Sequence, residues 1–342
     1  MGTRVLAWPA SKPETGNPYT ALLADALERH GASVDEFSPG RLVCGRYDVW
    51  HLHWPERVAD RLLRVPLFVA LVFLARARRM RLVWTVHNIE GHAGRHPRVE
   101  RRLMRWLSRH LDGIVTLSAA GARLAQRHYP ALDRAPSGVV PHGHYVGRYR
   151  NGIRPEVARV LLQLSSTDRV IAFVGRIASY KGVDRLVREF TKLEDDDVRL
   201  VVAGQVATAR LRESIEEAAG ADGRIRLFLD EVTDEELQVF LNAADLVALP
   251  YERILNSGSA LLALSFGRPV LVPATGAMAD LQAQLGDDAV RLFDGQLSSA
   301  QLTTALAGTA PKADELIARV RETHDWDTIA EHTLSLYAEA SR

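Results

Sequence analysis

The chain has 342 residues, enough for two domains that each bury a core of their own. Hydrophobic residues make up 47% and charged residues 25%, which is ordinary for a folded protein in water. The single cysteine, Cys44, excludes an internal disulfide and a metal centre built on clustered cysteines. The first residues do not form a secretory signal, and the longest apolar run, 66–75, is far shorter than the ~20 residues that span a bilayer, so we expect a cytoplasmic protein.

The net charge of +1 conceals a strong asymmetry along the chain. Residues 1–150 hold 23 Lys and Arg against 12 Asp and Glu, whereas residues 151–342 hold 20 against 30. This change of sign predicts a domain boundary near residue 150. The basic first half indicates either an anionic partner, such as a lipid surface, or an ordinary solvated arginine face. The basic stretches lack interleaved aromatic residues, so we expect no nucleic acid as a partner.

Short apolar runs alternate with amphipathic stretches, which is typical of βαβ units and parallel sheets. In the first half, the predicted strands are 4–8, 33–37, 49–52, 82–86, 113–117 and 138–140, with helices at 19–29, 62–80, 99–111 and 119–128. In the second half, the predicted strands are 170–174, 198–203, 225–228, 246–249, 270–272 and 290–292, with helices at 182–193, 207–218, 234–243, 259–266 and 278–284. The sequence therefore predicts an α/β protein with two doubly wound, Rossmann-like layers.

The segment 144–155 has Gly, Tyr and Arg without periodicity, so we interpret it as the linker. The predicted domains are residues 1–148 and 152–325, and a capped amphipathic helix at 326–342 packs back on the first domain. Two doubly wound domains that face each other across a cleft place ligands where the carboxyl ends of their strands meet.

The first candidate site follows the predicted strand 170–174, in the stretch FVGRIASYKGV. Arg176 lies in the glycine turn after the strand, and Lys181 stands directly before the next helix. Fixed cations beside a helix N-terminus suit a diphosphate, because Arg takes two phosphate oxygens in a fork and Lys supplies a point charge. The alternative is a surface loop with ordinary basic residues.

The stretch LPYERILNSGSALLALSFGRPVLVP completes this predicted diphosphate site. Ser257 and Ser259 open an apolar helix, whose free N–H groups point at an anion, and Gly258 lets a ligand approach the backbone closely. A plain capped helix is the alternative for this stretch alone. Gly204, after the strand 198–203, either flanks a base or ribose or forms a simple turn.

Histidine, tryptophan and glutamate gather after the predicted strands of the first half. Trp rings stack on sugar faces, and His or Glu can take a proton near pH 7, so we expect a sugar-binding, proton-handling surface. Because His51 and His53 alternate along a strand, one of them should point into the core. The candidate residues of this surface are Asn17, Tyr19, His53, Trp54, Glu56, His87, Asn88, His142 and His144.

A metal site is the alternative interpretation of these histidines. His51, His53, His87 and His92 could supply ligands, but no motif such as HExxH pairs them with a carboxylate. We therefore expect no metal and no other cofactor.

Several of these stretches occur in one order: NPYTALLADAL, RYDVWHLHWPE, TVHN, HGHY, YKGV, LPY with NSGSALLALSFGRPVL, and a closing helix with Trp and Tyr. In this order, and over nearly its full length, the chain resembles the GT-B glycosyltransferases. It is especially similar to the GDP-mannose-dependent β-mannosyltransferases of bacterial exopolysaccharide assembly, of the xanthan-pathway type. The resemblance implies GDP-mannose as donor, inversion at the anomeric carbon, and a saccharide or lipid-linked saccharide acceptor at the inner membrane face.

The resemblance assigns acceptor binding to the first domain and sugar-nucleotide binding to the second. An inverting transfer needs a base that takes the acceptor's hydroxyl proton, for which Glu56 is the first candidate and His87 the second. The expected donor-binding residues are Arg176, Lys181, Gly204, Tyr251, Glu252, Asn256, Ser257, Gly258 and Ser259.

One departure separates the chain from the retaining GT-B enzymes, which usually carry two glutamates about two helical turns apart. Here Leu262 occupies the second position, the first falls near Ile254, and Glu252 is out of step. This favours inversion. Two alternatives stay open: a retaining GT-B enzyme that uses a UDP-sugar, and a sugar-nucleotide epimerase or non-catalytic nucleotide-binding module.

The predicted helix 62–80 is apolar on a broad side and is followed by a basic one. Apolar residues beside arginines suit docking on an anionic membrane surface, which would make the protein peripheral on the inner face of the plasma membrane. A packed helix with a snorkelling arginine rim is the equal alternative. The arginines concerned are Arg76, Arg78, Arg79, Arg81, Arg98, Arg101, Arg102, Arg105 and Arg109.

Overall fold

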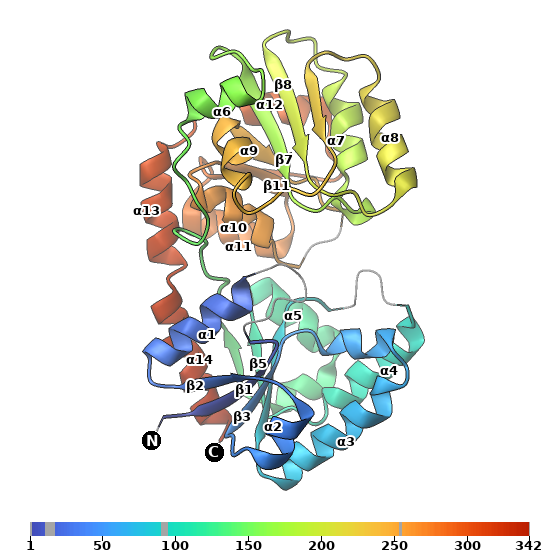
Figure 1. Cartoon of the computed structure of the whole chain (residues 1–342), viewed down its shortest axis with the longest axis vertical. Coiled ribbons are helices and arrows are strands. Elements are labelled where there is room, and N and C mark those ends of the chain that lie inside the picture. The colour runs from blue at the N-terminus through green and yellow to red at the C-terminus, as the bar shows by residue number, and fades with distance from the viewer. Residues whose placement is uncertain (1, 11–17, 90–94, 253–254, 342) are drawn as a thin grey trace. The chain divides into compact units, whose positions relative to one another are not determined.

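A computed structural model of the chain describes residues 2–10, 18–89, 95–252 and 255–341. The chain divides into two compact units, which we call unit 1 (Met1–Gly143 with His324–Arg342) and unit 2 (His144–Thr323). Within the described residues, each unit holds one six-stranded sheet whose strands are all parallel (Figure 1). The structure confirms the predicted fold class of two doubly wound α/β layers.

The sheet of unit 1 has the strand order β2-β1-β3-β4-β5-β6. Its strands are β1 (Arg4–Trp8), β2 (Ser33–Glu36), β3 (Val49–Leu52), β4 (Arg81–Val86), β5 (Gly113–Thr116) and β6 (Ser137–Val139). Its helices are α1 (Tyr19–Arg29), α2 (Pro39–Cys44), α3 (Arg64–Ala77), α4 (Pro97–Leu107), α5 (Ala119–His128) and α14 (Trp326–Ala340), with 3-10 helices η1 (Pro55–Asp60) and η2 (Pro130–Arg134). The chain order reverses direction at β1, which is where a doubly wound sheet binds its ligands.

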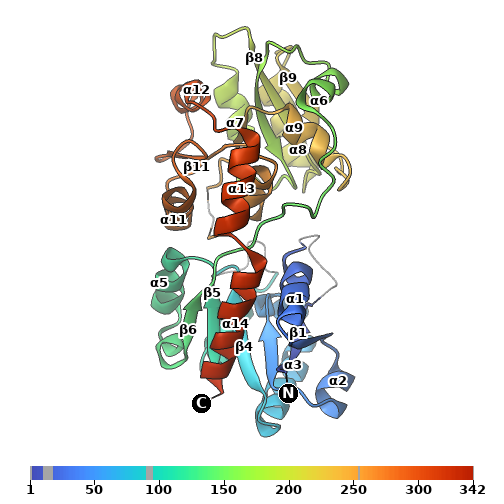
Figure 2. The same ribbon diagram turned by 90° about the vertical axis from the view of Figure 1, so that its left-hand side faces the viewer.

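Helix α14 returns to unit 1 from the far end of the sequence. It lies beside α1 and packs on β4, β5 and β6, while α3 and α4 cover the opposite face of the sheet (Figures 1 and 2). Its inner side chains, such as Ile329 and Tyr337, join a core that includes Val5, Val83 and Val115. The hydroxyl of Tyr337 also hydrogen-bonds Nδ1 of buried His51 at 2.7 Å, so α14 is anchored by a polar contact inside an apolar layer.

The sheet of unit 2 has the strand order β12-β11-β10-β7-β8-β9, with its reversal at β7. Its strands are β7 (Arg169–Val174), β8 (Val198–Ala203), β9 (Ile225–Phe228), β10 (Leu246–Ala248), β11 (Val270–Pro273) and β12 (Val290–Phe293). Its helices are α6 (Pro155–Leu161), α7 (Val183–Phe190), α8 (Ala209–Ala219), α9 (Leu237–Ala243), α10 (Gly258–Ser265), α11 (Gly276–Leu285), α12 (Ser299–Ala307) and α13 (Ala313–Thr323), with the 3-10 helix η3 (Ser179–Lys181). The central strands are almost continuous runs of buried apolar residues, as a sheet covered on both faces requires.

The structure corrects several predicted boundaries. The predicted helix 62–80 is shorter, because α3 ends before Arg78 and Arg79 adopts a left-handed φ of 60°. The predicted helix 234–243 begins only at Leu237. Short helices such as α2, α6 and η1 were not predicted, because six or seven residues make too few turns to show a periodic pattern of apolar residues. In the described part of the chain, no helix combines the length and apolar character needed to cross a membrane.

The hydroxyl of Tyr337 yields a test of how α14 is held. Replacing Tyr337 with Phe leaves the imidazole nitrogen of His51 unpaired in the core, which should lower the free energy of unfolding by about 1–3 kcal/mol. Tyr47→Phe is the matched control: it removes a hydrogen bond to Asp35 that lies near solvent, and should cost less than about 0.5 kcal/mol.

Urea unfolding followed by tryptophan fluorescence measures both variants. All six tryptophans lie in unit 1, so this signal follows that unit alone. Equal midpoints for Tyr337→Phe and the wild type would show that the hydrogen bond does not hold the helix.

Candidate active site

Three strand ends of unit 2 meet so closely that glycine is required at two positions. Gly204, after β8, has φ +144°, and a Cβ there would lie 2.1 Å from the carbonyl oxygen of Gly175 after β7. Gly182, before α7, has φ +64°, and a Cβ there would lie 2.4 Å from the carbonyl oxygen of Pro250 after β10. These are contacts that no side chain tolerates. The loops after β7, β8 and β10 therefore form one surface at the carboxyl edge of the sheet.

Lys181 and the start of α10 come together on this surface. The ammonium of Lys181 lies 5.5 Å from the ring centroid of Tyr251, a favourable cation–π arrangement. The hydroxyl of Tyr251 hydrogen-bonds the side chains of Ser257 and Ser259. Ser257 caps α10 by accepting a hydrogen bond from the Ala260 amide at 3.0 Å. One cation, two hydroxyls and a helix N-terminus thus share a single small area.

The charge of Lys181 is held there at an electrostatic cost. Burial lowers its pKa, and the guanidinium of Arg176 lowers the pKa further, whereas Tyr180 acts in the opposite direction. Lys181 and Arg176 are neighbouring positive charges, and Lys181 is largely desolvated. Binding of an anion beside them is therefore favourable. The arrangement can therefore hold a diphosphate with fixed cations and backbone amides.

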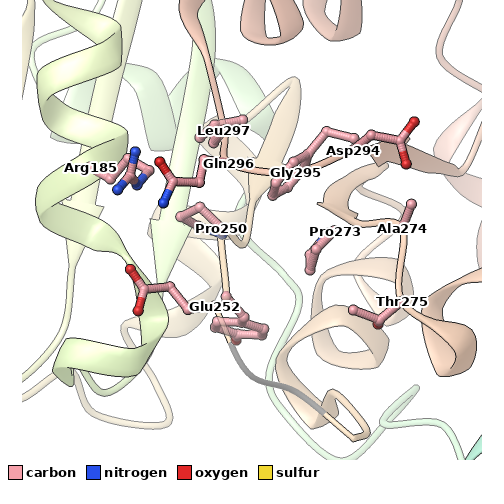
Figure 3. A pocket seen from close by; sticks show the side chains of 12 residues that line it. Arg185, Pro250, Glu252, Pro273, Ala274, Thr275, Asp294, Gly295, Gln296 and Leu297 are labelled. Atoms are coloured by element: carbon pink, nitrogen blue, oxygen red, sulfur yellow. The ribbon is translucent and has the colours of Figure 1, made fainter.

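An open pocket of about 420 Å³ adjoins this cluster at the carboxyl ends of β10, β11 and β12 (Figure 3). Tyr251 and Glu252 line it and connect it to the predicted donor-binding residues. Arg185 and Gln296 lie at one end of the pocket, and Thr275 and Asp294 lie at the other (Figure 3). The lining offers several hydrogen-bond donors and acceptors around an otherwise apolar floor.

Two buried polar atoms in this region have no hydrogen-bond partner among the described residues: the amide nitrogen of Asn256 and the hydroxyl oxygen of Thr275. Each such atom costs free energy unless a ligand or water satisfies it. Asn256 belongs to the predicted donor-binding set. Thr275, Arg185 and Gln296 were missed, although Thr275 and Gln296 follow correctly predicted strands and the rule that ligands bind at strand ends could have found them.

Unit 1 holds a cluster of rings at the ends of β3 and β4. His87 directly follows β4, and its Nε2 lies 3.1 Å from Nδ1 of His53. Trp54 stacks on the His87 ring at 4.4 Å and 20°, and Tyr19 meets that ring edge-on at 5.0 Å. The ring of His142 lies 4.7 Å from that of Tyr19. Three of the predicted acceptor-side residues, His53, Trp54 and Tyr19, thus contact His87.

Burial keeps these histidines uncharged. It lowers the pKa of His53 and of His87 well below the ordinary value, and neighbouring histidines lower both further. The prediction that one of His51 and His53 points into the core is confirmed for His51, and His53 is buried as well. His51 points into the core and is held by Thr85 and Tyr337, whereas His53 lies beyond the end of β3, where the alternation of a strand no longer applies.

The sequence suggested that Glu56 lies at a strand end, but in the structure it lies in η1. Its side chain is buried, and burial raises its pKa to about 8, with the charge of Glu100 as a further raising cause. A hydrogen bond from Asn88 and the charge of Arg57 act in the opposite direction. A carboxyl with a pKa near 8 can exchange a proton close to physiological pH.

The other residues predicted for the first half do not form one group with these. Asn17, His92 and Ile254 lie outside the described residues. His142 and His144 fall into different units, and Nδ1 of His144 accepts a hydrogen bond from the Val146 amide. Over the described ranges, no three His, Cys, Asp or Glu side chains are grouped in a way that could hold a metal ion.

Comparisons with known proteins agree with this architecture. Residues 37–148 match the model of Glycosyltransferase Family 4, and residues 168–322 match that of Glycosyl transferases group 1. Among solved structures, sucrose-phosphate synthase from Thermosynechococcus elongatus has a TM-score of 0.75 at 16% identity, covering 99% of this chain and 98% of that one. Anabaena HepE in complex with UDP has a TM-score of 0.68 at 17% identity, covering 98% and 99%. At these identities the likeness concerns the fold.

Two curated relatives are similar in sequence. D-inositol 3-phosphate glycosyltransferase of Corynebacterium diphtheriae is 28% identical over 68% of this chain and 56% of its own length. GDP-mannose:glycolipid 4-beta-D-mannosyltransferase of Xanthomonas campestris is 31% identical over 95% of this chain and 88% of its own length. With two parallel doubly wound units and this full-length similarity, the chain belongs to the GT-B glycosyltransferase family that includes the Xanthomonas mannosyltransferase.

Proposed function

We propose that this glycosyltransferase moves mannose from GDP-mannose, with inversion, to a saccharide or lipid-linked saccharide acceptor. The observation that carries the proposal is the 31% identity, over 95% of the chain, to an enzyme named for GDP-mannose, a glycolipid and a 4-β linkage. A β-linked product from an α-linked sugar nucleotide requires inversion. Leu262, which stands where retaining relatives have a glutamate, supports the same stereochemistry.

In this proposal the diphosphate lies at the start of α10. Lys181 and Arg176 balance the charge that develops on the leaving group, and the first amides of α10 hydrogen-bond its oxygens. These groups are held in place before the reaction, so little reorganisation is needed as the bond breaks. The polar pocket beside Tyr251 suits the hydroxyl groups of a hexose, for which Thr275 in its lining has unused hydrogen-bonding capacity.

The proton of the acceptor hydroxyl goes to a group of unit 1. Glu56 is our first candidate, because its raised pKa makes the ionised form a competent base near pH 8. His87 is the second candidate, since its ring is neutral and fixed by His53 and Trp54. In either case the acceptor sugar would contact Trp54 and the surrounding rings.

The donor is tested by thermal shift. GDP and GDP-mannose should raise the melting temperature, whereas UDP and dTDP should raise it less at equal concentration, because only a ligand that binds the native state stabilises it. The anomeric configuration of the isolated product, measured by NMR, then tests inversion. A larger shift with UDP-sugars, together with an α-linked product, would replace the proposal by a retaining UDP-sugar enzyme.

Lys181→Gln tests the diphosphate site. The variant should lose about 10²-fold or more in kcat/KM, because one of the two cations facing the leaving group is gone. Lys192→Gln removes an exposed lysine of the same unit, paired only with Glu189 at the surface, and should retain wild-type kinetics. Similar losses in both variants would place the effect outside the proposed site.

Chelation tests whether the cations act without a metal. Excess EDTA should leave the initial rate within about twofold, because Lys181 and Arg176 supply the charge that a divalent ion provides elsewhere. A large loss that magnesium restores would contradict this arrangement.

The base is identified by a pair of carboxyl variants. Turnover of the wild type should rise with pH through about 8, since the Glu56 carboxyl must lose its proton before it can accept another. Glu56→Gln should lower kcat by about 10²-fold or more at every pH while leaving donor binding intact.

Glu100→Gln is the matched control, because Glu100 is equally buried and raises the pKa of Glu56. This variant should keep the maximal rate and shift the rising limb of the pH profile to lower pH. If Glu56→Gln retains full turnover and His87→Gln does not, the base is His87.

A further inference from the structure

His53 and His87 form a hydrogen-bonded pair of rings at the ends of β3 and β4. Nδ1 of His53 lies 3.1 Å from Nε2 of His87, so one of these two nitrogens carries a proton and the other accepts the hydrogen bond. The two residues are far apart in the sequence and meet because β3 and β4 are neighbouring parallel strands. The sheet of unit 1 therefore sets the distance between the two rings.

The plane of the His87 ring is fixed by its neighbours. Trp54 stacks on this ring with the centroids 4.4 Å apart, and the edge of Tyr19 meets it at 5.0 Å. His53 is buried in turn, and its ring lies 4.3 Å from that of His51 in the core. What remains to be set in this arrangement is which nitrogen of His87 carries the proton.

The two nitrogens of the His87 ring face different surroundings. Nε2 is paired with His53, whereas Nδ1 has no hydrogen-bond partner among residues 2–10, 18–89, 95–252 and 255–341. In the same part of the chain, Nδ1 is not one of the fully buried polar atoms that lack a partner, so it keeps some contact with the solvent. His87 as a whole is only half-buried. Nδ1 is therefore the atom of this ring that a ligand can reach.

Two arrangements of the protons are compatible with this pair, because burial lowers the pKa of both rings and keeps them neutral. In the first arrangement, Nε2–H of His87 donates to Nδ1 of His53, and both rings carry their proton on Nε2. In the second arrangement, Nδ1–H of His53 donates to Nε2 of His87, and both rings carry their proton on Nδ1. A neutral histidine side chain in water prefers the proton on Nε2, so both rings favour the first arrangement.

We propose that His53 is a positioning residue: it accepts the Nε2–H of His87 and so keeps Nδ1 of His87 as a hydrogen-bond acceptor for a hydroxyl group of the sugar that receives mannose. In the opposite tautomer, Nδ1 would carry the proton and could only donate. A hydroxyl that donates to Nδ1 is held in one orientation, with its oxygen lone pairs free for the reaction. This hydrogen bond is formed whether His87 or Glu56 finally removes the proton.

The inference rests on the proposed function, because a sugar hydroxyl beside the rings of unit 1 is part of that proposal. Its first test needs neither nucleotide nor turnover, so that the two proposals can fail separately. The measurement is a long-range proton–nitrogen correlation spectrum of the whole chain with isotope-labelled histidine, in which the two nitrogen shifts of a ring reveal its tautomer. The signals of His87 are those that disappear in His87→Gln. In the wild type, His87 should carry its proton on Nε2.

Two substitutions of His53 separate positioning from packing. In His53→Phe, a ring of similar size remains, but Nε2–H of His87 loses the atom that accepts its hydrogen bond. A buried N–H group without a partner costs free energy, so the proton should move to the accessible Nδ1. In His53→Asn, the side-chain oxygen takes the place of Nδ1 and should restore the tautomer of the wild type. Tyr337→Phe is the control, because it weakens the core of unit 1 without removing either ring of the pair and should leave the tautomer unchanged.

Hydrolysis of GDP-mannose, measured as release of GDP without any sugar acceptor, gives the kinetic counterpart, since water then takes the place of the sugar hydroxyl. His53→Phe should lower this rate at least about tenfold, because a histidine in the wrong tautomer cannot accept the hydroxyl hydrogen bond, and His53→Asn should recover most of the rate. The thermal shift with GDP-mannose should stay as in the wild type for both variants.

The inference is overturned if His87 of the wild type carries its proton on Nδ1, or if His53→Phe leaves the tautomer unchanged. It is also overturned if His53→Asn fails to restore the tautomer, or if Tyr337→Phe shifts it as much as His53→Phe does. If the wild type releases no GDP at all, the proposed function fails, and the spectra still decide the role of His53.

Discussion

The whole donor side depends on how closely three loops of unit 2 can approach one another. Gly204 and Gly182 have backbone conformations and contacts that exclude any side chain, and they bring the ends of β7, β8 and β10 together. Only this proximity places Lys181 against the Tyr251 ring, and Tyr251 against the two serines that open α10. Each contact compensates in part for the desolvation of the ammonium group: the ring faces it with negative charge density, and the neighbouring hydroxyls orient their dipoles. In the proposed function, the diphosphate would compensate the rest.

In unit 1, burial has the opposite effect on the charge of the side chains. In unit 2 a charge is retained despite desolvation, whereas in unit 1 desolvation keeps the groups neutral: His53 and His87 are unprotonated, and the raised pKa of Glu56 favours its protonated form at neutral pH. In the proposed function, the groups of unit 2 would stabilise a negative leaving group and a group of unit 1 would accept a proton. A permanently ionised carboxylate beside the acceptor would be a weaker base, because a low pKa accompanies low basicity.

The sequence predicted more of the fold than of the site. Long runs of buried apolar residues, as in β7 and β8, identify strands of a two-sided parallel sheet, and the structure brings together Lys181 and Ser257, which the sequence had placed in two separate loops after strands. Thr275 follows a predicted strand, and the rule that ligands bind at strand ends could have drawn attention to it, but only the structure shows that its hydroxyl is buried and unpaired. The burial of His53 was also missed, because the chain leaves β3 at Leu52 and periodicity gives no information about the irregular turn that follows. Glu56 was expected at a strand end but lies in η1, because a 3-10 helix of six residues is too short to produce a periodic pattern in the sequence.

The asymmetry of charge along the chain takes on a different meaning once the structure is known. Residues 151–342 are acidic overall, yet the neighbouring cations Arg176 and Lys181 lie there, so in the proposed function the local arrangement, and not the net charge, would attract the donor. Residues 1–150 are strongly basic, yet the candidate acceptor residues around His87 are aromatic or neutral. The excess positive charge of unit 1 therefore lies outside the candidate site, on exposed side chains such as Arg101, Arg102 and Arg105 of α4.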